Sequence, residues 1–165
     1  MPVLLDSRYR LLEYRGLTAC TPNESEVEQV LDFRIDDDPD ALERAGREVL
    51  ERTRMRGVLI TRGSRGMALF QHKQPTIHVP IFGSDEIADV TGAGDTVIAT
   101  CALALAAGGS FYEAALLANY AGGIVVMKRG TATVSARELS AAVETDHDTS
   151  LENWSQEGPA QGRKG

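Results

Sequence analysis

Cysteine is scarce in this chain. Cys20 and Cys101 are far apart, and neither belongs to a CxxC pair or lies in a cluster of histidines. A disulfide framework or a zinc site is therefore not expected.

Long hydrophobic runs are also lacking. The longest apolar stretches, residues 96–107 and 114–127, are shorter than the roughly 18 residues of a membrane-spanning helix. The amino-terminus reaches Asp6 before a signal-peptide core could form. We therefore expect a cytoplasmic protein without a membrane partner.

Positive charge is in deficit. Lys and Arg total 17 against 24 Asp and Glu, which gives a net charge of −7. A basic surface for nucleic acid is therefore not expected. A phosphate ligand stays open, because backbone N–H groups at a helix N-terminus bind anions without a local excess of Lys or Arg.

The composition is otherwise that of one packed domain. The chain has 165 residues, of which 42% are hydrophobic and 25% charged, close to the average of globular proteins. Apolar runs and turn residues predict strands and alternating helical segments. The strands are expected at 3–5, 17–20, 57–61, 67–70 and 78–80, and the helices at 24–31, 39–55, 96–107, 110–128 and 135–143.

Strands that alternate with helices predict an α/β fold with a mainly parallel sheet flanked by helices. Such a sheet binds ligands at the carboxyl ends of its strands. We expect an ordered part at residues 1–143 and a polar, disordered tail at 144–165, where the sequence has no period and becomes rich in glycine.

The most informative segment is DVTGAGDT at residues 89–96, directly before an apolar helix. Gly92, Ala93 and Gly94 leave backbone N–H groups uncovered, which suits an anion hole at a helix N-terminus. Asp95 beside it could accept a proton from a hydroxyl that attacks a phosphoryl group. A plain turn with Asp95 as the helix cap explains the same residues.

Two further segments could contact a nucleotide. The turn TRGSRG at residues 61–66 could hold phosphates through backbone N–H groups, with Arg62 or Arg65 adding charge, although a simple hairpin turn fits equally. Asn23 and Glu26 share one helix face, and their oxygens suit Mg²⁺. An ordinary capped helix start is the alternative.

Taken in order, TPNxxE, TxGxxG and DxTGAGDT resemble the carboxyl-terminal half of the ribokinase-like (PfkB) sugar kinases. The resemblance runs from about Val3 to Val143. VTGAGDTVIA at 90–99 and GTATVS at 130–135 look most like the heptose-7-phosphate kinase part of ADP-heptose synthases.

The resemblance implies a ribokinase-like fold and a role for each matching residue. Asp95 is implied as the catalytic base, with Gly92, Ala93 and Gly94 as the anion hole. The other implied residues are Thr61, Gly63 and Gly66 for the nucleotide phosphates, Asn119 for the adenine pocket, Asn23 and Glu26 for Mg²⁺, and Asp89, Thr91 and Gly130 for a monovalent cation such as K⁺. Exposure of Asn119 on its helix, and Gly130 as a helix C-terminal glycine, are the simpler alternatives.

The chain departs from the family in one respect. It starts at a strand from the middle of the family fold, so the amino-terminal half and the lid, which supply most sugar contacts, are not matched. A sheet without those strands would expose an apolar edge. The partners implied are a sugar or sugar phosphate, and either a separate amino-terminal half or a second copy of the chain.

The function expected is an ATP-dependent sugar kinase, which transfers a phosphoryl group from ATP to a sugar hydroxyl, with heptose 7-phosphate as the acceptor that the narrower resemblance implies. The alternative is a non-catalytic nucleotide-binding or assembly module derived from such a kinase. The absence of the amino-terminal half favours the module for this chain, and the presence of Asp95 favours the kinase.

Overall fold

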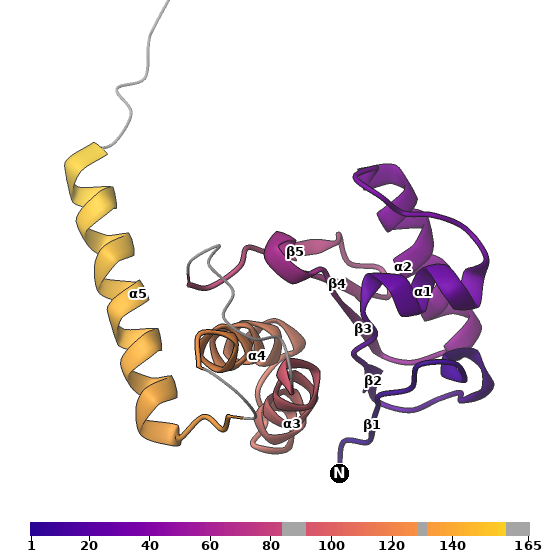
Figure 1. The fold of residues 1–165 in the computed structure, drawn as a ribbon, viewed down its shortest axis with the longest axis horizontal. Helices are drawn as coiled ribbons and strands as arrows, with labels where there is room; N and C mark the ends of the chain where they lie inside the picture. The colour runs from indigo at the N-terminus through magenta and orange to yellow at the C-terminus, as the bar shows by residue number, and fades with distance from the viewer. Residues whose placement is uncertain (84–91, 129–131, 158–165) are drawn as a thin grey trace, which may run out of the picture.

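The computed structural model describes residues 1–83, 92–128 and 132–157, with side chains described up to Asp146 (Figure 1). A central sheet lies between two layers of helices. The elements, in order, are β1 (Leu4–Leu5), η1 (Leu11–Glu13), β2 (Ala19–Cys20), α1 (Glu24–Leu31), α2 (Pro39–Thr53), β3 (Gly57–Thr61), η2 (Gly63–Arg65), β4 (Met67–Gln71), β5 (Ile77–Val79), α3 (Ala93–Ala106), α4 (Phe111–Val126) and α5 (Ala136–Glu157).

The sheet confirms the predicted α/β architecture. Its strand order is β1-β2-β3-β4-β5, and β1, β2 and β3 are parallel to one another. The predicted hairpin of β3 and β4 makes the remainder antiparallel, so the sheet is mixed. The strand expected at 78–80 is β5, which pairs only with β4 among the described strands, and Pro80 follows its last residue.

Alternating side chains of the central strands divide the core into two parts. In β3, Val58 and Ile60 join the cluster with α1 and α2, whereas Leu59 joins the cluster with α3 and α4. The helices α1 and α2 accordingly cover one face, and α3 and α4 cover the other (Figure 1). Gly46 allows α2 to approach β4, because a Cβ at that position would lie 2.3 Å from the ring of Phe70.

The helices α1, α2 and α4 begin at side-chain caps. Asn23, Asp38 and Ser110 each accept a hydrogen bond from a backbone N–H in the first turn of α1, α2 and α4. The predicted starts of α1 and α2 are thereby confirmed, with Asn23 as the cap of α1.

The third helix, α3, begins earlier than the sequence predicted. It starts at Ala93 instead of Thr96, because Gly92 takes a left-handed conformation (φ 80°) that turns the chain into the helix. Gly94 and Asp95 consequently lie inside its first turn rather than in a loop.

The last helix, α5, extends beyond the predicted end at Val143 and continues to Glu157. Residues 144–157, where the sequence predicts a disordered tail, are helical in the structure. The physical reason is local, because no Gly or Pro interrupts the chain between Ala136 and Glu157. Ser135 and Glu138 form a capping box at the start of this helix, since the side chain of each accepts a hydrogen bond from the backbone N–H of the other.

Of the helices that the structure describes, none combines the length and the apolar character needed to cross a bilayer.

Candidate functional site

A cleft of about 650 Å³ lies where the parallel strands end. Asp6 follows β1, Asn23 follows β2 and Thr61 ends β3, and all three line the cleft. Asn23 and Thr61 also form an isolated parallel bridge that extends the pairing of β2 with β3. The cleft therefore occupies the position where parallel sheets bind their ligands.

The N-terminus of α3 forms one wall of this cleft. Gly92, Ala93, Gly94 and Asp95 all line it. Unlike α1, α2 and α4, this helix has no side-chain cap. The N–H and the hydroxyl of Thr96 both donate to the Gly92 carbonyl, at 3.1 and 3.0 Å, which closes the first turn. The N–H groups ahead of Thr96 are left for an anion in the cleft.

Asp95 lies in the first turn of α3 and is exposed on the cleft wall. The carboxylate makes no hydrogen bond that would cap the helix, so the described geometry does not support the alternative of Asp95 as a cap. Asp95 is available to a ligand beside the uncapped N–H groups. A Cβ added at Gly94 would meet no atom within 4 Å, so the space beside Asp95 is open.

The turn after β3 forms a second wall. Thr61, Gly63 and Gly66, for which the sequence predicts contacts with nucleotide phosphates, line the cleft. Gly66 has a φ of 74°, and a Cβ there would lie 2.1 Å from the carbonyl oxygen of Val79. The turn is therefore packed against the end of β5, and only glycine fits at Gly66.

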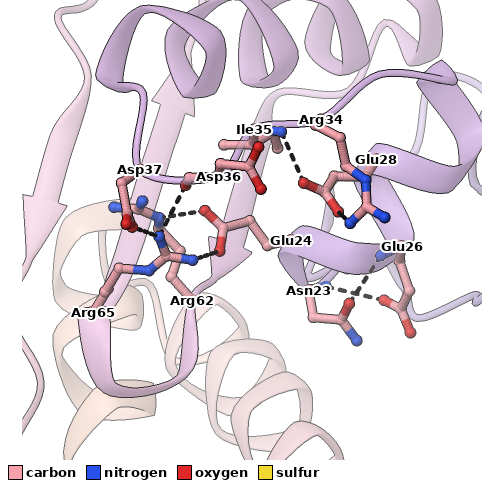
Figure 2. Close-up of polar contacts among 10 residues, drawn as sticks. All are labelled: Asn23, Glu24, Glu26, Glu28, Arg34, Ile35, Asp36, Asp37, Arg62 and Arg65. Atoms are coloured by element: carbon pink, nitrogen blue, oxygen red, sulfur yellow. Dashed lines mark hydrogen bonds and ion pairs between the residues drawn. The ribbon is translucent and has the colours of Figure 1, made fainter.

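The two arginines of this turn do not line the cleft. The expectation that they add charge to a phosphate site is therefore wrong for this structure. Figure 2 shows that both contact Glu24 at the start of α1. The Arg62 Nε donates to Glu24 at 2.9 Å, and both side chains are only 13% exposed. Arg65 also pairs with Asp37, and neither arginine is among the described residues that line the cleft.

Asn23 and Glu26 form a capping box at the start of α1 (Figure 2). The Asn23 Oδ1 accepts from the N–H of Glu26, and the Glu26 Oε2 accepts from the N–H of Asn23, both at 2.9 Å. Asn23 lines the cleft, whereas Glu26 does not reach its described wall. The box leaves Oε1 of Glu26 and a second lone pair of the Asn23 oxygen, which suits an ion that keeps most of its waters.

No group of three or more His, Cys, Asp or Glu within the described ranges could by itself enclose a metal. The free oxygens of Asn23 and Glu26 are too few to enclose Mg²⁺ without water or phosphate as further ligands.

Asn119 is buried on α4, with 7% of its surface exposed, so the alternative of an exposed helix residue is wrong. Its Nδ2 donates to the Pro80 carbonyl at 2.8 Å. The side chain also lines the cleft, beside Gly122 and Gly123. At Gly123 a Cβ would lie 2.4 Å from the Phe82 carbonyl oxygen. This end of the cleft is built from small and apolar residues against the segment after β5.

Three predicted residues, Asp89, Thr91 and Gly130, lie outside the described residues.

The cysteines do not take part. Both are buried, and burial raises the pKa of the Cys20 and Cys101 thiols to about 12. Neither supplies a thiolate near neutral pH.

Sequence reasoning missed several residues of the cleft. Asp6 could have been found, because it directly follows the first apolar run and so had to lie at a strand's carboxyl end. Arg8 carried no such signal, since its position depends on the loop after β1. The other residues that line the cleft and that the sequence analysis did not identify are Met67, Ile81, Val97, Gly122, Gly123 and Val126.

The sequence and the fold of this chain are similar to those of known proteins. The model of the pfkB family of carbohydrate kinases matches residues 1–138. The bifunctional protein HldE of Aeromonas hydrophila is 45% identical over 150 residues, which cover 90% of this chain and 31% of that protein. HldE of Methylococcus capsulatus is 46% identical over 143 residues, covering 86% of this chain and 30% of that protein.

Solved structures show the same fold. Arabidopsis thaliana ribokinase, solved with ribose and ATP, superposes with a TM-score of 0.71 at 25% identity, over 78% of this chain and 41% of that one. Phosphofructokinase-2 from Escherichia coli superposes with a TM-score of 0.72 at 20% identity, over 82% of this chain and 43% of that one.

The chain thus spans about a third of the length of the curated relatives it matches. Its fold is ribokinase-like, and it covers part of that fold. The match extends over more than four-fifths of the sequence and includes every element from β1 to α4. This chain belongs to the pfkB family of carbohydrate kinases.

Proposed function

We propose that residues 1–143 are the carboxyl-terminal, nucleotide-binding part of an ATP-dependent sugar kinase. The observation that carries the proposal is the uncapped N-terminus of α3, with Asp95 in its first turn, in the wall of a cleft at the carboxyl ends of β1, β2 and β3. An anion-binding helix end beside a free carboxylate is the arrangement that phosphoryl transfer to a hydroxyl requires.

In the proposed reaction a sugar hydroxyl oxygen forms a bond to the γ-phosphorus of ATP, and the bond from that phosphorus to the β-phosphate oxygen breaks. Asp95 accepts the hydroxyl proton. The N–H groups at Gly92, Ala93 and Gly94 donate to the transferred phosphoryl oxygens and stabilise their charge. ADP and the phosphorylated sugar are the products.

The rest of the cleft would hold the nucleotide. Backbone groups of Thr61, Gly63 and Gly66 would contact its phosphates, and the pocket beside Asn119 would take the adenine. Mg²⁺ bound to the phosphates would neutralise their charge, and Asn23 and Glu26 would hold it through its water shell. A monovalent cation such as K⁺ at Asp89, Thr91 and Gly130 stays a prediction, as does a cytoplasmic location.

The acceptor that the resemblance suggests is heptose 7-phosphate. A second candidate function is supported by a separate observation: this chain covers only 41% of the ribokinase it resembles. In that alternative the chain is a nucleotide-binding or assembly module without catalysis of its own. A separate amino-terminal half, or a second copy of the chain, is the partner that we propose for either candidate.

Nucleotide binding is tested by calorimetric titration with Mg·ATP. Gly94→Val adds a side chain in open space at the helix end, so we expect a folded variant that loses saturable binding. Ala99→Val is the matched control, because Ala99 is exposed on the same helix and does not line the cleft. Equal binding by all three proteins would contradict the proposed anion hole.

Catalysis is tested by adding an amino-terminal half from a related kinase as a separate polypeptide. Turnover that depends on both parts, and that Asp95→Asn abolishes, supports the kinase. Asp40→Asn is the control, because Asp40 lies in the first turn of α2, away from the cleft. Binding of Mg·ATP without turnover in the presence of the added half would favour the module.

A further inference from the structure

Arg8 is a cation of the cleft that no described carboxylate neutralises. It lines the cleft in the segment after β1 and is exposed. It makes no ion pair or side-chain hydrogen bond within the described part of the chain. Arg62 and Arg65, which the sequence singled out, are instead engaged by Glu24 and Asp37 (Figure 2).

The strand order gives the cleft two different ends. Asp6 and Arg8 follow β1 at one edge of the sheet, and Ile81 follows β5 at the other edge. Neighbouring strands lie about 4.8 Å apart, so the two edges are separated by about 19 Å. The β1 end carries charged side chains, whereas the β5 end is lined by Ile81 and by the small and apolar residues of α4.

A nucleotide bound with its base at the apolar end would extend its phosphates past the N-terminus of α3 toward β1. Of the two charged side chains at that end, Asp6 and Arg8, only the cation attracts a phosphate, so the phosphates would be bound by Arg8. A guanidinium without a protein partner binds a phosphate with no existing ion pair to break, which makes it a stronger ligand than Arg62 or Arg65.

We infer that Arg8 binds a phosphate group at the β1 end of the cleft. This inference deepens the proposed function and rests on it for the direction of the nucleotide. Two sources supply the same chemistry: the terminal phosphate of ATP, or a phosphate carried by the acceptor sugar. Arg8 is a binding residue, and Asp95 remains the group that takes the proton.

The test titrates the wild-type chain, Arg8→Gln and Arg10→Gln by calorimetry with Mg·ATP, AMP and sedoheptulose 7-phosphate. Arg10→Gln is the matched control, because Arg10 is exposed two residues away, pairs with Glu13 and does not line the cleft. Both variants should fold like the wild type, which thermal unfolding checks, because both side chains lie on the surface.

For the ATP source, Arg8→Gln weakens binding of Mg·ATP about tenfold and leaves AMP unchanged. If the phosphate belongs to the acceptor sugar, Arg8→Gln weakens binding of sedoheptulose 7-phosphate about tenfold and leaves binding of Mg·ATP unchanged. Arg10→Gln changes neither. Either pattern supports the inference and names the phosphate.

Other results overturn it. If Arg8→Gln binds every probe as the wild type does, the inference fails, while saturable binding of Mg·ATP leaves the proposed function intact. If Arg8→Gln weakens the binding of Mg·ATP and of AMP equally, Arg8 does not contact the terminal phosphate of ATP. If the wild type binds sedoheptulose 7-phosphate but no nucleotide, the proposed function fails. The inference about Arg8 is then tested only by whether Arg8→Gln weakens binding of the sugar phosphate. A folded wild type that binds none of the probes overturns both.

Discussion

At the scale of single residues, Gly66 lets the turn after β3 pack against the sheet. Its φ of 74° and the 2.1 Å approach of a Cβ to the Val79 carbonyl oxygen leave no room for a side chain. Gly66→Ala should lower the free energy of unfolding by about 3 kcal/mol, from backbone strain and overpacking together. Urea denaturation measures this loss.

Gly63→Ala separates the two contributions. Gly63 also has a positive φ, but a Cβ there would meet nothing within 4 Å. We expect a loss of only about 1 kcal/mol, from the left-handed conformation alone. An equal loss in both variants would mean that the contact with Val79 costs nothing.

Glu138 provides a prediction about charge at the start of α5. Its carboxylate accepts hydrogen bonds from Lys128 and Ser135, which lower its pKa to about 2 from an ordinary value of 4.5. The stabilisation is therefore complete above about pH 4.5 and is lost as the pH falls through about 2.

Lys128→Met removes the largest cause and should raise the pKa of Glu138 toward 4.5, as read from the carboxyl carbon in an NMR titration. Lys73→Met, at an exposed lysine with no ion pair to Glu138, should leave that pKa unchanged. A midpoint near 2 in the Lys128 variant would show that Ser135 alone holds the carboxylate.

At the scale of elements, Glu24 joins α1 to the turn η2. Its two oxygens contact Arg62 and Arg65, so one carboxylate at the start of a helix fixes the loop that lines the cleft (Figure 2). Glu24→Gln should reduce stability by about 1–2 kcal/mol. It should also weaken Mg·ATP binding, because Thr61 and Gly63 are then held less firmly.

Glu28→Gln is the control for this prediction. Glu28 lies on the same helix and pairs with Arg34, but neither residue lines the cleft. We expect Mg·ATP binding equal to that of the wild type in calorimetry. If Glu24→Gln binds nucleotide as tightly as Glu28→Gln, the turn does not depend on the ion pairs.

At the scale of the whole molecule, β1 is an edge strand of the described sheet. Within the described strands β1 pairs only with β2, and Val3 beside it is 47% exposed. An apolar sheet edge promotes association of chains. We expect the chain to self-associate with rising concentration in sedimentation velocity, and Val3→Lys to reduce this association.

Tyr112→Lys tests whether the edge is responsible. Tyr112 is 46% exposed at the start of α4 and does not belong to a strand of the sheet. It removes a comparable apolar surface and should leave association unchanged. A chain that remains monomeric at every concentration would contradict the prediction.

The sequence predicted most elements of this molecule because their signals are local. Apolar runs mark β1 to β4, and caps at Asn23, Asp38 and Ser135 mark helix starts. The polar composition after Val143 predicts disorder, whereas the structure continues α5 to Glu157, and no Gly or Pro occurs between Val143 and Gly158.

The candidate site was predictable where a residue lies in a motif directly after a strand or before a helix. The glycines of the α3 start, Asp95, Asn23 and Thr61 all meet in one cleft. The fate of each charge was not predictable. In the sequence, Arg62 and Arg65 resemble arginines that bind phosphate. In the structure they instead pair with Glu24, which lies 38 and 41 residues away in the chain.

The sequence by itself determined which segments become strands and helices and which residues could carry chemistry, because periodicity, caps and glycine turns act over a few residues. Tertiary structure alone decided that α3 begins uncapped, that Asn119 is buried against Pro80 and that Arg8 is the cation without an ion pair among the described residues of the cleft. These facts depend on contacts between residues far apart in the chain, which no local pattern encodes.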